Sequence, residues 1–238
     1  MDKFLIELGA TKTLKAVLQC CRKKLLSLGV TRASYFIAPS FSRPTGKNVI
    51  VVQFGFPGAA LLRYRDQEFR DNDPVANFVM KTARTGTWLK IIKSQKLSLA
   101  QKDYIKFTQA QGLFDGVAIP LFGPNGRDAY CTVSLSDREI LPEDENLIRL
   151  ITTICQASYR RICRLMDDQV VKPITISKRE TEVLFWMAHS KSNTDIATIL
   201  GVSPATVDTH VRRIYSKFEV NDRIAAIVRG LSLGLVRL

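Results

Sequence analysis

Polar and charged side chains recur at helical spacing near the C-terminus, between Pro204 and Phe218. Within this stretch Val207, Val211 and Ile214 lie three or four residues apart, which predicts the buried stripe of a helix. The opposite face of the predicted helix carries hydroxyls, a carboxylate and cations: Thr206, Asp208, Thr209, Arg212, Arg213 and Lys217. Such groups read base edges and hold phosphates in protein–DNA complexes. We therefore expect this face to contact double-stranded DNA.

Helix caps and a glycine turn predict the elements that would position this face. The capping residues are Ser177 with Glu180 for a first helix, Ser192 or Asn193 for a second, and Ser203 with Pro204 for a third. Gly201 suits the turn between the second and third helices, because glycine adopts a left-handed backbone at little cost. This order is typical of a helix-turn-helix, and the alternative is a small helical bundle that binds no DNA.

A last helix is predicted from Asp222 to about Ser232, and it is too short to bury all of its apolar side chains alone. These side chains are Ile224, Ile227, Val228 and Leu231. One helix-turn-helix reads only a few base pairs, so such domains usually bind paired half-sites as dimers. We expect a homodimer in which Ile227, Val228 and Leu231 contact the second subunit, with the long helix from Pro142 to Met166 as a second candidate for subunit contact.

The C-terminal segment resembles the DNA-binding domain of LuxR-type transcription regulators. The residues that carry the resemblance are 177–184, 188, 191–197, 200–211, 214, 217–218, 220, 223, 225 and 230–231. By position on the recognition helix, the resemblance implies base contacts from Asp208, Thr209 and Arg212. It implies phosphate contacts from Lys191, Asn193, Thr206, Arg213 and Lys217. The chain departs from the family pattern at Ser190, usually glycine, and at Asp208, where many relatives carry lysine.

The N-terminal part reads as helices and strands in an order that does not alternate. Helices are expected over 3–28, around Leu61 and Tyr64, from Asp73 and Pro74 onward, over 98–111 and over 142–166. Strands are expected over 34–38, 49–54, 116–122 and 128–136. Thr87 and Trp88 are expected to be extended. Leu99, Tyr104 and Phe107 are expected to face inward on their helix. The fold class predicted is an α+β domain, an α/β/α sandwich with an antiparallel sheet, followed by an all-α helix-turn-helix domain.

This part resembles, more faintly, the signal-binding domain of the same regulators. The resemblance runs through Phe56 and Pro57, Tyr64, Asp73 and Pro74, Trp88, Gly112, Gly116 and Pro120. In that family a tyrosine and an aspartate hold the amide of an acyl-homoserine lactone, and a tryptophan four residues before the tyrosine holds the lactone carbonyl. Tyr64, Asp73 and Trp88 match a ligand-binding set, but Ala60 stands at the tryptophan position and cannot donate a hydrogen bond. We expect ordinary lactones to bind weakly or not at all.

Composition bounds the remaining possibilities. The 238 residues carry 35 basic and 22 acidic side chains, a net charge of +13, which favours a polyanionic partner. The five cysteines show no metal-ligand spacing and are expected to be reduced thiols. The sequence lacks phosphate-loop and nucleophile motifs, so no enzyme activity and no cofactor are expected. No apolar run of membrane-spanning length occurs, and we expect a cytoplasmic protein.

Two hypotheses follow from these observations. The first is a ligand-gated LuxR-type regulator with a signal-binding and dimerisation domain at 1–166, a linker at 167–175 and a DNA-binding domain at 176–238. The second is a ligand-independent regulator whose N-terminal domain serves dimerisation or binds a protein antagonist. The sequence does not identify a ligand or a target promoter.

Overall fold

A computed structural model describes residues 1–39, 44, 49–135, 139–169 and 174–237, and the side chains of 142 and 167–169 are outside the description. The chain forms two compact units, Met1–Asp167 and Asp168–Leu238. Ser136 at the end of a predicted strand and Pro173 of the predicted linker lie outside the described residues.

The first unit is built on a five-stranded sheet in the order β2-β1-β5-β4-β3, with every neighbouring pair antiparallel. The strands are β1 (Arg32–Ile37), β2 (Ile50–Phe54), β3 (Gly86–Thr87), β4 (Val117–Phe122) and β5 (Asp128–Ser134). Strands β4 and β5 form the hairpin that Pro124, Asn125 and Gly126 predict, with Phe122 opposite Asp128. The antiparallel sheet of the predicted fold class is confirmed.

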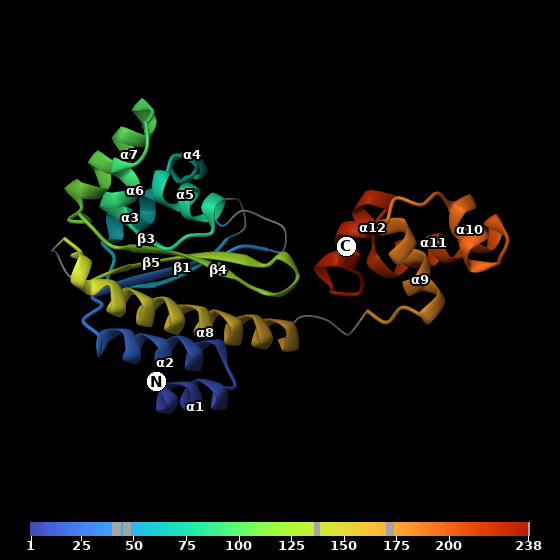
Figure 1. Ribbon diagram of the computed structural model, residues 1–238, viewed down its shortest axis with the longest axis horizontal. Helices are drawn as coiled ribbons and strands as arrows, with labels where there is room; N and C mark the ends of the chain where they lie inside the picture. The colour runs from blue at the N-terminus through green and yellow to red at the C-terminus, as the bar shows by residue number, and fades with distance from the viewer. Residues whose placement is uncertain (40–43, 45–48, 136–138, 170–173, 238) are drawn as a thin grey trace. The chain divides into compact units, whose positions relative to one another are not determined.

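Helices cover both faces of this sheet (Figure 1). On one face lie α3 (Gly58–Arg63), α4 (Gln67–Asp71), α5 (Pro74–Thr82), α6 (Trp88–Lys93) and α7 (Leu99–Ala110). On the other face lies α8 (Glu145–Gln169), with α2 (Leu14–Leu26) and α1 (Asp2–Ala10) beside it. The α/β/α layering is therefore confirmed as well.

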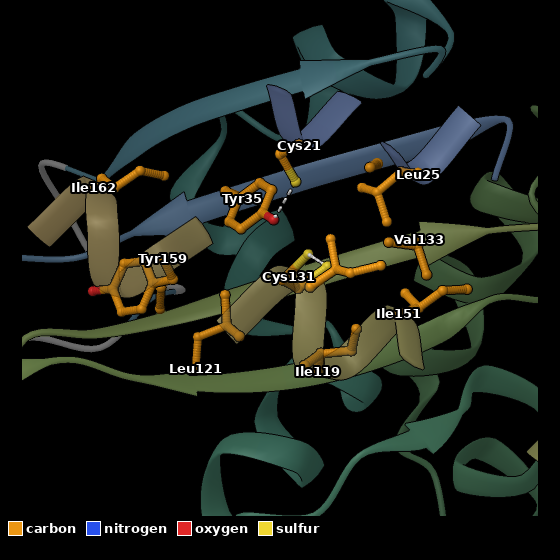
Figure 2. Close-up of a cluster of buried hydrophobic side chains, with 14 of the residues drawn as sticks. Cys21, Leu25, Tyr35, Ile119, Leu121, Cys131, Val133, Ile151, Tyr159 and Ile162 are labelled. Carbon is orange, nitrogen blue, oxygen red and sulfur yellow. Dashed lines mark hydrogen bonds between the residues drawn. The ribbon is translucent and has the colours of Figure 1, made fainter. Parts of the chain in front are cut away.

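The main core of this unit lies between the sheet and the layer of α2 and α8 (Figure 2). Leu25, Ile119 and Ile151 are among its fully buried side chains. The Cys21 thiol and the Tyr35 hydroxyl lie 3.1 Å apart, and burial raises the pKa of Cys21 to about 12. All five cysteines are free, and four of them are buried, so their chemistry is that of small apolar side chains.

Several predictions about the N-terminal elements are wrong. The single helix expected over 3–28 is two helices, because Thr13 accepts a hydrogen bond from the Ala16 amide at 3.1 Å and starts α2 anew. Trp88 begins α6 instead of continuing an extended segment, and α4 was not predicted. Leu99, expected to face inward, is 80% exposed.

The described residues of the second unit form four helices: α9 (Lys178–Ala188), α10 (Asn193–Leu200), α11 (Pro204–Phe218) and α12 (Arg223–Ser232). Ser177 and Ser192 form capping boxes, and Ser203 caps α11 as expected. Gly201 takes a φ of 64° at the turn between α10 and α11. Ser190 takes a φ of 59°, a conformation that costs serine more than glycine. The left-handed backbone therefore explains why glycine would suit this position better than serine.

Candidate functional site

A cavity of about 80 Å³ lies between the sheet and the helical layer of α3 to α7. Tyr64, Asp73, Trp88 and Ala60 all line it, so the structure brings together the four positions that the sequence singled out. Most of the remaining lining is apolar or aromatic: Phe36, Phe56, Phe69, Tyr104, Phe107 and Tyr130 are among these residues. A concave space with aromatic walls and few polar groups is the usual form of a small-molecule site.

Asp73 is the polar centre of this pocket, and its carboxylate is fully occupied by the protein. One oxygen, Oδ1, caps α5 by accepting from the amides of Val75 at 2.9 Å and Ala76 at 3.0 Å. The other, Oδ2, accepts from the hydroxyls of Tyr64 at 2.8 Å and Tyr104 at 3.0 Å. A carboxylate offers about four acceptor positions, so these four bonds use all of them.

The environment of Asp73 keeps its neighbours protonated. Burial raises the pKa of Asp73 above its ordinary value, although its four hydrogen bonds act in the opposite direction. Burial, followed by the charge on Asp73, raises the pKa of Tyr64 and of Tyr104 well above the ordinary value. Both phenols are therefore neutral donors at physiological pH.

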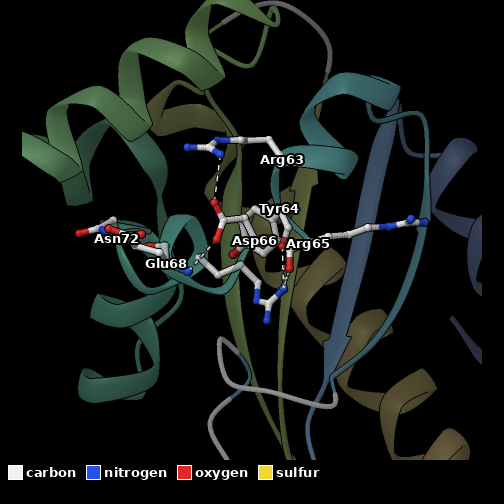
Figure 3. Close-up of polar contacts among 7 residues, drawn as sticks. Arg63, Tyr64, Arg65, Asp66, Glu68 and Asn72 are labelled. Atoms are coloured by element: carbon white, nitrogen blue, oxygen red, sulfur yellow. Dashed lines mark hydrogen bonds and ion pairs between the residues drawn. The ribbon is translucent and has the colours of Figure 1, made fainter.

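A network of polar contacts at the end of α3 positions Tyr64 (Figure 3). The Arg70 guanidinium donates to the backbone carbonyls of Tyr64 and Arg65, both at 2.8 Å. Asp66 caps α4 by accepting from the Glu68 amide at 3.1 Å and pairs with Arg63 at 3.0 Å. The sharp corner between α3 and α4 thus points the Tyr64 ring at Asp73.

Trp88 forms a wall of the pocket, and its only hydrogen-bond donor is already used. Its Nε1 donates to the Thr132 hydroxyl at 2.9 Å. A Cβ added at Gly116 would lie 2.5 Å from the indole, so glycine at this position is what allows the ring to pack against β4. The indole can therefore offer a ligand an apolar surface, without a free donor.

Tyr104 is the pocket residue whose role sequence reasoning missed, since it was expected only to face inward from α7. The available signal was its hydroxyl, because a tyrosine on the inner face of a helix needs a hydrogen-bond partner. Its partner, Asp73, lies 31 residues earlier in the chain, and only the packing of α7 over α5 brings the two together.

In the second unit, α11 presents the polar face that the sequence predicts. Thr209, Arg212 and Arg213 are exposed, whereas Val207, Val211, Ile214 and Phe218 are buried. Thr206 is exposed and its hydroxyl lies 2.9 Å from that of Ser203 at the helix start. The exposed cations and hydroxyls have the chemistry for contacts with DNA.

Two residues of the predicted DNA-binding set are bonded to one another. Asn193 Nδ2 donates to Asp208 Oδ1 at 2.6 Å, and Arg223 Nη1 donates to Asn193 Oδ1 at 3.0 Å. The Arg223 guanidinium also donates to the carbonyl of Lys191. This chain of bonds links α10, α11 and α12, and it fixes the orientation of the Asp208 carboxylate.

Lys217, predicted to hold a phosphate, has an anionic partner within its own domain. Its Nζ lies 2.7 Å from Glu180 Oε2, and the side chains of Lys217 and Glu180 are 39% and 3% exposed. Burial acts to raise the pKa of Glu180, but hydrogen bonds from Lys217 and Ser177 outweigh it and hold the pKa below the ordinary value. The ion pair ties the start of α9 to the end of α11.

The apolar face of α12 is divided between the domain core and the surface. Ile227 and Leu231 are partly buried against the core of the unit. Ile224 and Val228 are 74% and 45% exposed. Exposed aliphatic side chains side by side on one helix are typical of a contact surface.

An α/β/α unit with an aromatic pocket and a separate helical unit with a helix-turn-helix form the domain architecture of a two-domain transcription regulator. The family model described as the autoinducer binding domain matches residues 13–162, and that of bacterial regulatory proteins of the luxR family matches residues 175–229. The chain belongs to the LuxR family of transcriptional regulators, which confirms the resemblance seen in its sequence.

Relatives agree with this assignment over most of the chain. The quorum-sensing regulator RhlR of Pseudomonas aeruginosa is 25% identical, with 93% of this chain and 90% of RhlR covered. The regulatory protein SdiA of Escherichia coli is 27% identical, with 82% and 79% covered. A crystal structure of SdiA superposes with a TM-score of 0.78 at 23% identity over 98% of this chain and 96% of SdiA, which shows a shared fold.

The described residues also bear on membranes and on metal ions. None of the helices in this part of the chain combines the length and the apolar content that a membrane span requires. No three His, Cys, Asp or Glu side chains come together there as a set of metal ligands.

Proposed function

We propose that this LuxR-type regulator acts as a homodimer on paired DNA half-sites in the cytoplasm and does not depend on ordinary acyl-homoserine lactones. In this proposal residues 1–166 form the signal-binding-like and dimerisation domain, 167–175 the linker and 176–238 the DNA-binding domain. The observation that carries the DNA-binding role is the exposed row of Thr209, Arg212 and Arg213 on α11, directly after the glycine turn.

The individual DNA contacts follow from exposure and from bonds within the domain. Thr209 and Arg212 are proposed to reach base edges, and Lys191, Thr206 and Arg213 to contact phosphates. Asp208 is proposed to accept from a base amino group with its free oxygen, while Asn193 holds the other oxygen. The ion pair with Glu180 supports a structural role for Lys217 in addition to any phosphate contact.

The proposal about lactones rests on the hydrogen-bond inventory of the pocket. Ala60 lines the cavity without a polar group, the Trp88 indole already donates to Thr132, and Asp73 has four donors of its own. A buried polar group of a ligand that finds no partner costs on the order of 1–3 kcal/mol. A solved structure of SdiA, which shares this fold, is of SdiA in complex with octanoyl-rac-glycerol, and this supports a ligand of another neutral class.

A second candidate function is that of a ligand-independent regulator whose N-terminal domain serves dimerisation or receives a protein antagonist. The observation that favours it is again the pocket, in which Asp73, Tyr64 and Tyr104 satisfy one another without any ligand. These mutual hydrogen bonds support the proposal that the core folds without a bound molecule. Both candidates share the DNA-binding role and differ in whether the pocket is ever occupied.

The exposed apolar pair on α12, Ile224 and Val228, supports the proposed subunit contact, and α8 remains the second candidate. The test is selection of binding sites from random DNA by the full-length protein, followed by sizing of the complex. We expect two half-sites separated by about one helical turn or more and two chains per DNA. A monomer that binds a single half-site tightly would contradict the proposed assembly.

A further inference from the structure

The Asp73 carboxylate has no acceptor left for a ligand. Its four hydrogen bonds come from the amides of Val75 and Ala76 and from the hydroxyls of Tyr64 and Tyr104. The residue is only 3% exposed, so water does not compete for these positions from outside. Any ligand N–H that approaches Asp73 must therefore displace one of the four donors.

Two of the four donors are backbone amides in the first turn of α5. The third is the Tyr64 hydroxyl, which belongs to a residue whose backbone carbonyl accepts a hydrogen bond from Arg70. Tyr104 differs, because it projects from α7, a helix in which no residue is fully buried. Its hydroxyl is thus the donor that can leave Asp73 with the least disturbance to the fold.

We propose that Tyr104 sets the ligand class of this pocket, by taking the acceptor on Asp73 that a ligand N–H would need. The pocket then selects neutral ligands with an apolar or aromatic body that present no donor to Asp73, and it discriminates against N-acyl amides. This inference rests on the proposed function only in that it treats the cavity as a ligand site.

The other polar groups of the pocket agree with this preference. The Thr132 hydroxyl accepts from Trp88 and donates to the Val117 carbonyl, and the Thr108 hydroxyl donates to the Ile105 carbonyl. Ser34 also lines the pocket, at 2% exposure. Ser34 can serve one polar group of a ligand, such as an ester carbonyl, whereas an amide brings both a carbonyl and an N–H.

The cost of an unpaired N–H gives the size of the effect. An amide either leaves its own N–H unsatisfied or releases the Tyr104 hydroxyl, and each alternative leaves one buried polar group without a partner. The energy of one such group corresponds to roughly a five- to hundredfold loss of affinity. An ester of the same length and shape avoids this loss.

The test compares methyl octanoate with N-methyloctanamide, two ligands that differ by an ester oxygen in place of an N–H. Binding to the full-length protein is measured by ligand-observed NMR titration. Wild-type protein is expected to prefer the ester. Tyr104→Phe keeps the ring but frees one acceptor on Asp73, and the ratio of affinities is expected to move toward the amide by roughly tenfold or more.

Tyr130→Phe is the matched control, because Tyr130 lines the same pocket at 3% exposure and stacks on Phe36 but is not bonded to Asp73. Its ratio of affinities should equal that of wild type. The inference is overturned by a wild type that binds the amide as tightly as the ester or binds neither, by an unchanged ratio in Tyr104→Phe, or by an equal shift in the control.

Two arrangements keep the outcome decisive. If Tyr104→Phe fails to fold, the ratio of ester to amide affinity in the wild type alone decides whether the pocket discriminates against the amide. DNA binding is measured on the same preparations, so that loss of the proposed function is seen separately. Wild-type protein that binds its DNA but neither ligand overturns only the inference about Tyr104, whereas protein that binds no DNA overturns the proposed function.

Discussion

Replacing Lys217 by methionine removes the cation that lies 2.7 Å from the buried carboxylate of Glu180 while keeping most of the apolar stem. After the change Glu180 Oε2 retains its bond from the Ser177 amide at 2.6 Å, but it loses the ion pair with Lys217. The Glu180 side chain is 3% exposed in the unmodified protein, so water reaches its carboxylate poorly. The variant therefore separates a structural role of Lys217 from a role in phosphate binding.

The magnitude follows from the burial of the two partners. Breaking a fully buried ion pair costs about 3–5 kcal/mol. The Lys217 side chain is 39% exposed, so the pair is partly solvated, and a value of about 1.5–3 kcal/mol, typical of a hydrogen bond to a charged group, is expected. For a unit of this size, this lowers the melting temperature of the C-terminal domain by roughly 10 °C.

The assay is hydrogen exchange of the α9 and α11 amides in the full-length protein, which reports the stability of the C-terminal unit separately. The double variant Glu180→Gln/Lys217→Met should recover part of the loss, because it leaves no uncompensated charge. Glu182→Gln is the control, since its pair with Arg179 is 49% and 37% exposed and should contribute about 0–1 kcal/mol. Unchanged protection in Lys217→Met, with a salt slope for DNA binding lower by about one, would refute the structural role and restore that of a phosphate contact.

Three further outcomes are expected. Arg212→Ala should cost about 1–3 kcal/mol on the preferred site and relax the preference at one base pair; equal losses on all sequences in a fluorescence-anisotropy titration would contradict a base contact. Val228→Asp, at an exposed position on α12, should weaken DNA binding by breaking the dimer, while the thermal unfolding of the chain stays unchanged. Leu231→Asp should also unfold the domain, because Leu231 is partly buried in the core. The pKa of Glu180 is lowered in the folded protein, so the ionised carboxylate stabilises the fold above its unfolded pKa of about 4.3, and this effect is lost as the pH falls through the folded pKa. In urea titrations, the difference in stability between wild type and Glu180→Gln should therefore vanish in acid. A difference that persists in acid would contradict a stabilising role of the Glu180 charge.

Local signals in the sequence predict those parts of the fold that depend on neighbouring residues. Caps such as Ser177, Ser203 and Asp73 fix helix starts through bonds to amides two or three residues later, and these starts agree with the structure. The break before α2 was missed although Thr13 makes the same kind of bond, because the apolar spacing on both sides of it fits one continuous helix. The apolar spacing favoured one continuous helix over a break at Thr13, so one helix was predicted where the chain has two.

The candidate sites show a similar limit. Tyr64, Asp73 and Trp88 were chosen by resemblance, and they do line one pocket. The bonds that decide what the pocket can bind join residues far apart in the chain, such as Tyr104 with Asp73 and Trp88 with Thr132. No spacing rule predicts these bonds, because they depend on how α7 and β5 pack against the rest of the domain.

We propose that this chain folds and binds DNA without an acyl-homoserine lactone. The most direct measurement is DNA binding by full-length protein purified from a host that makes no lactones, with and without a panel of lactones of different acyl chain lengths. We expect soluble protein whose affinity for DNA does not change across the panel. Protein that stays insoluble until one lactone is supplied, and then binds that lactone at nanomolar concentration, would contradict it.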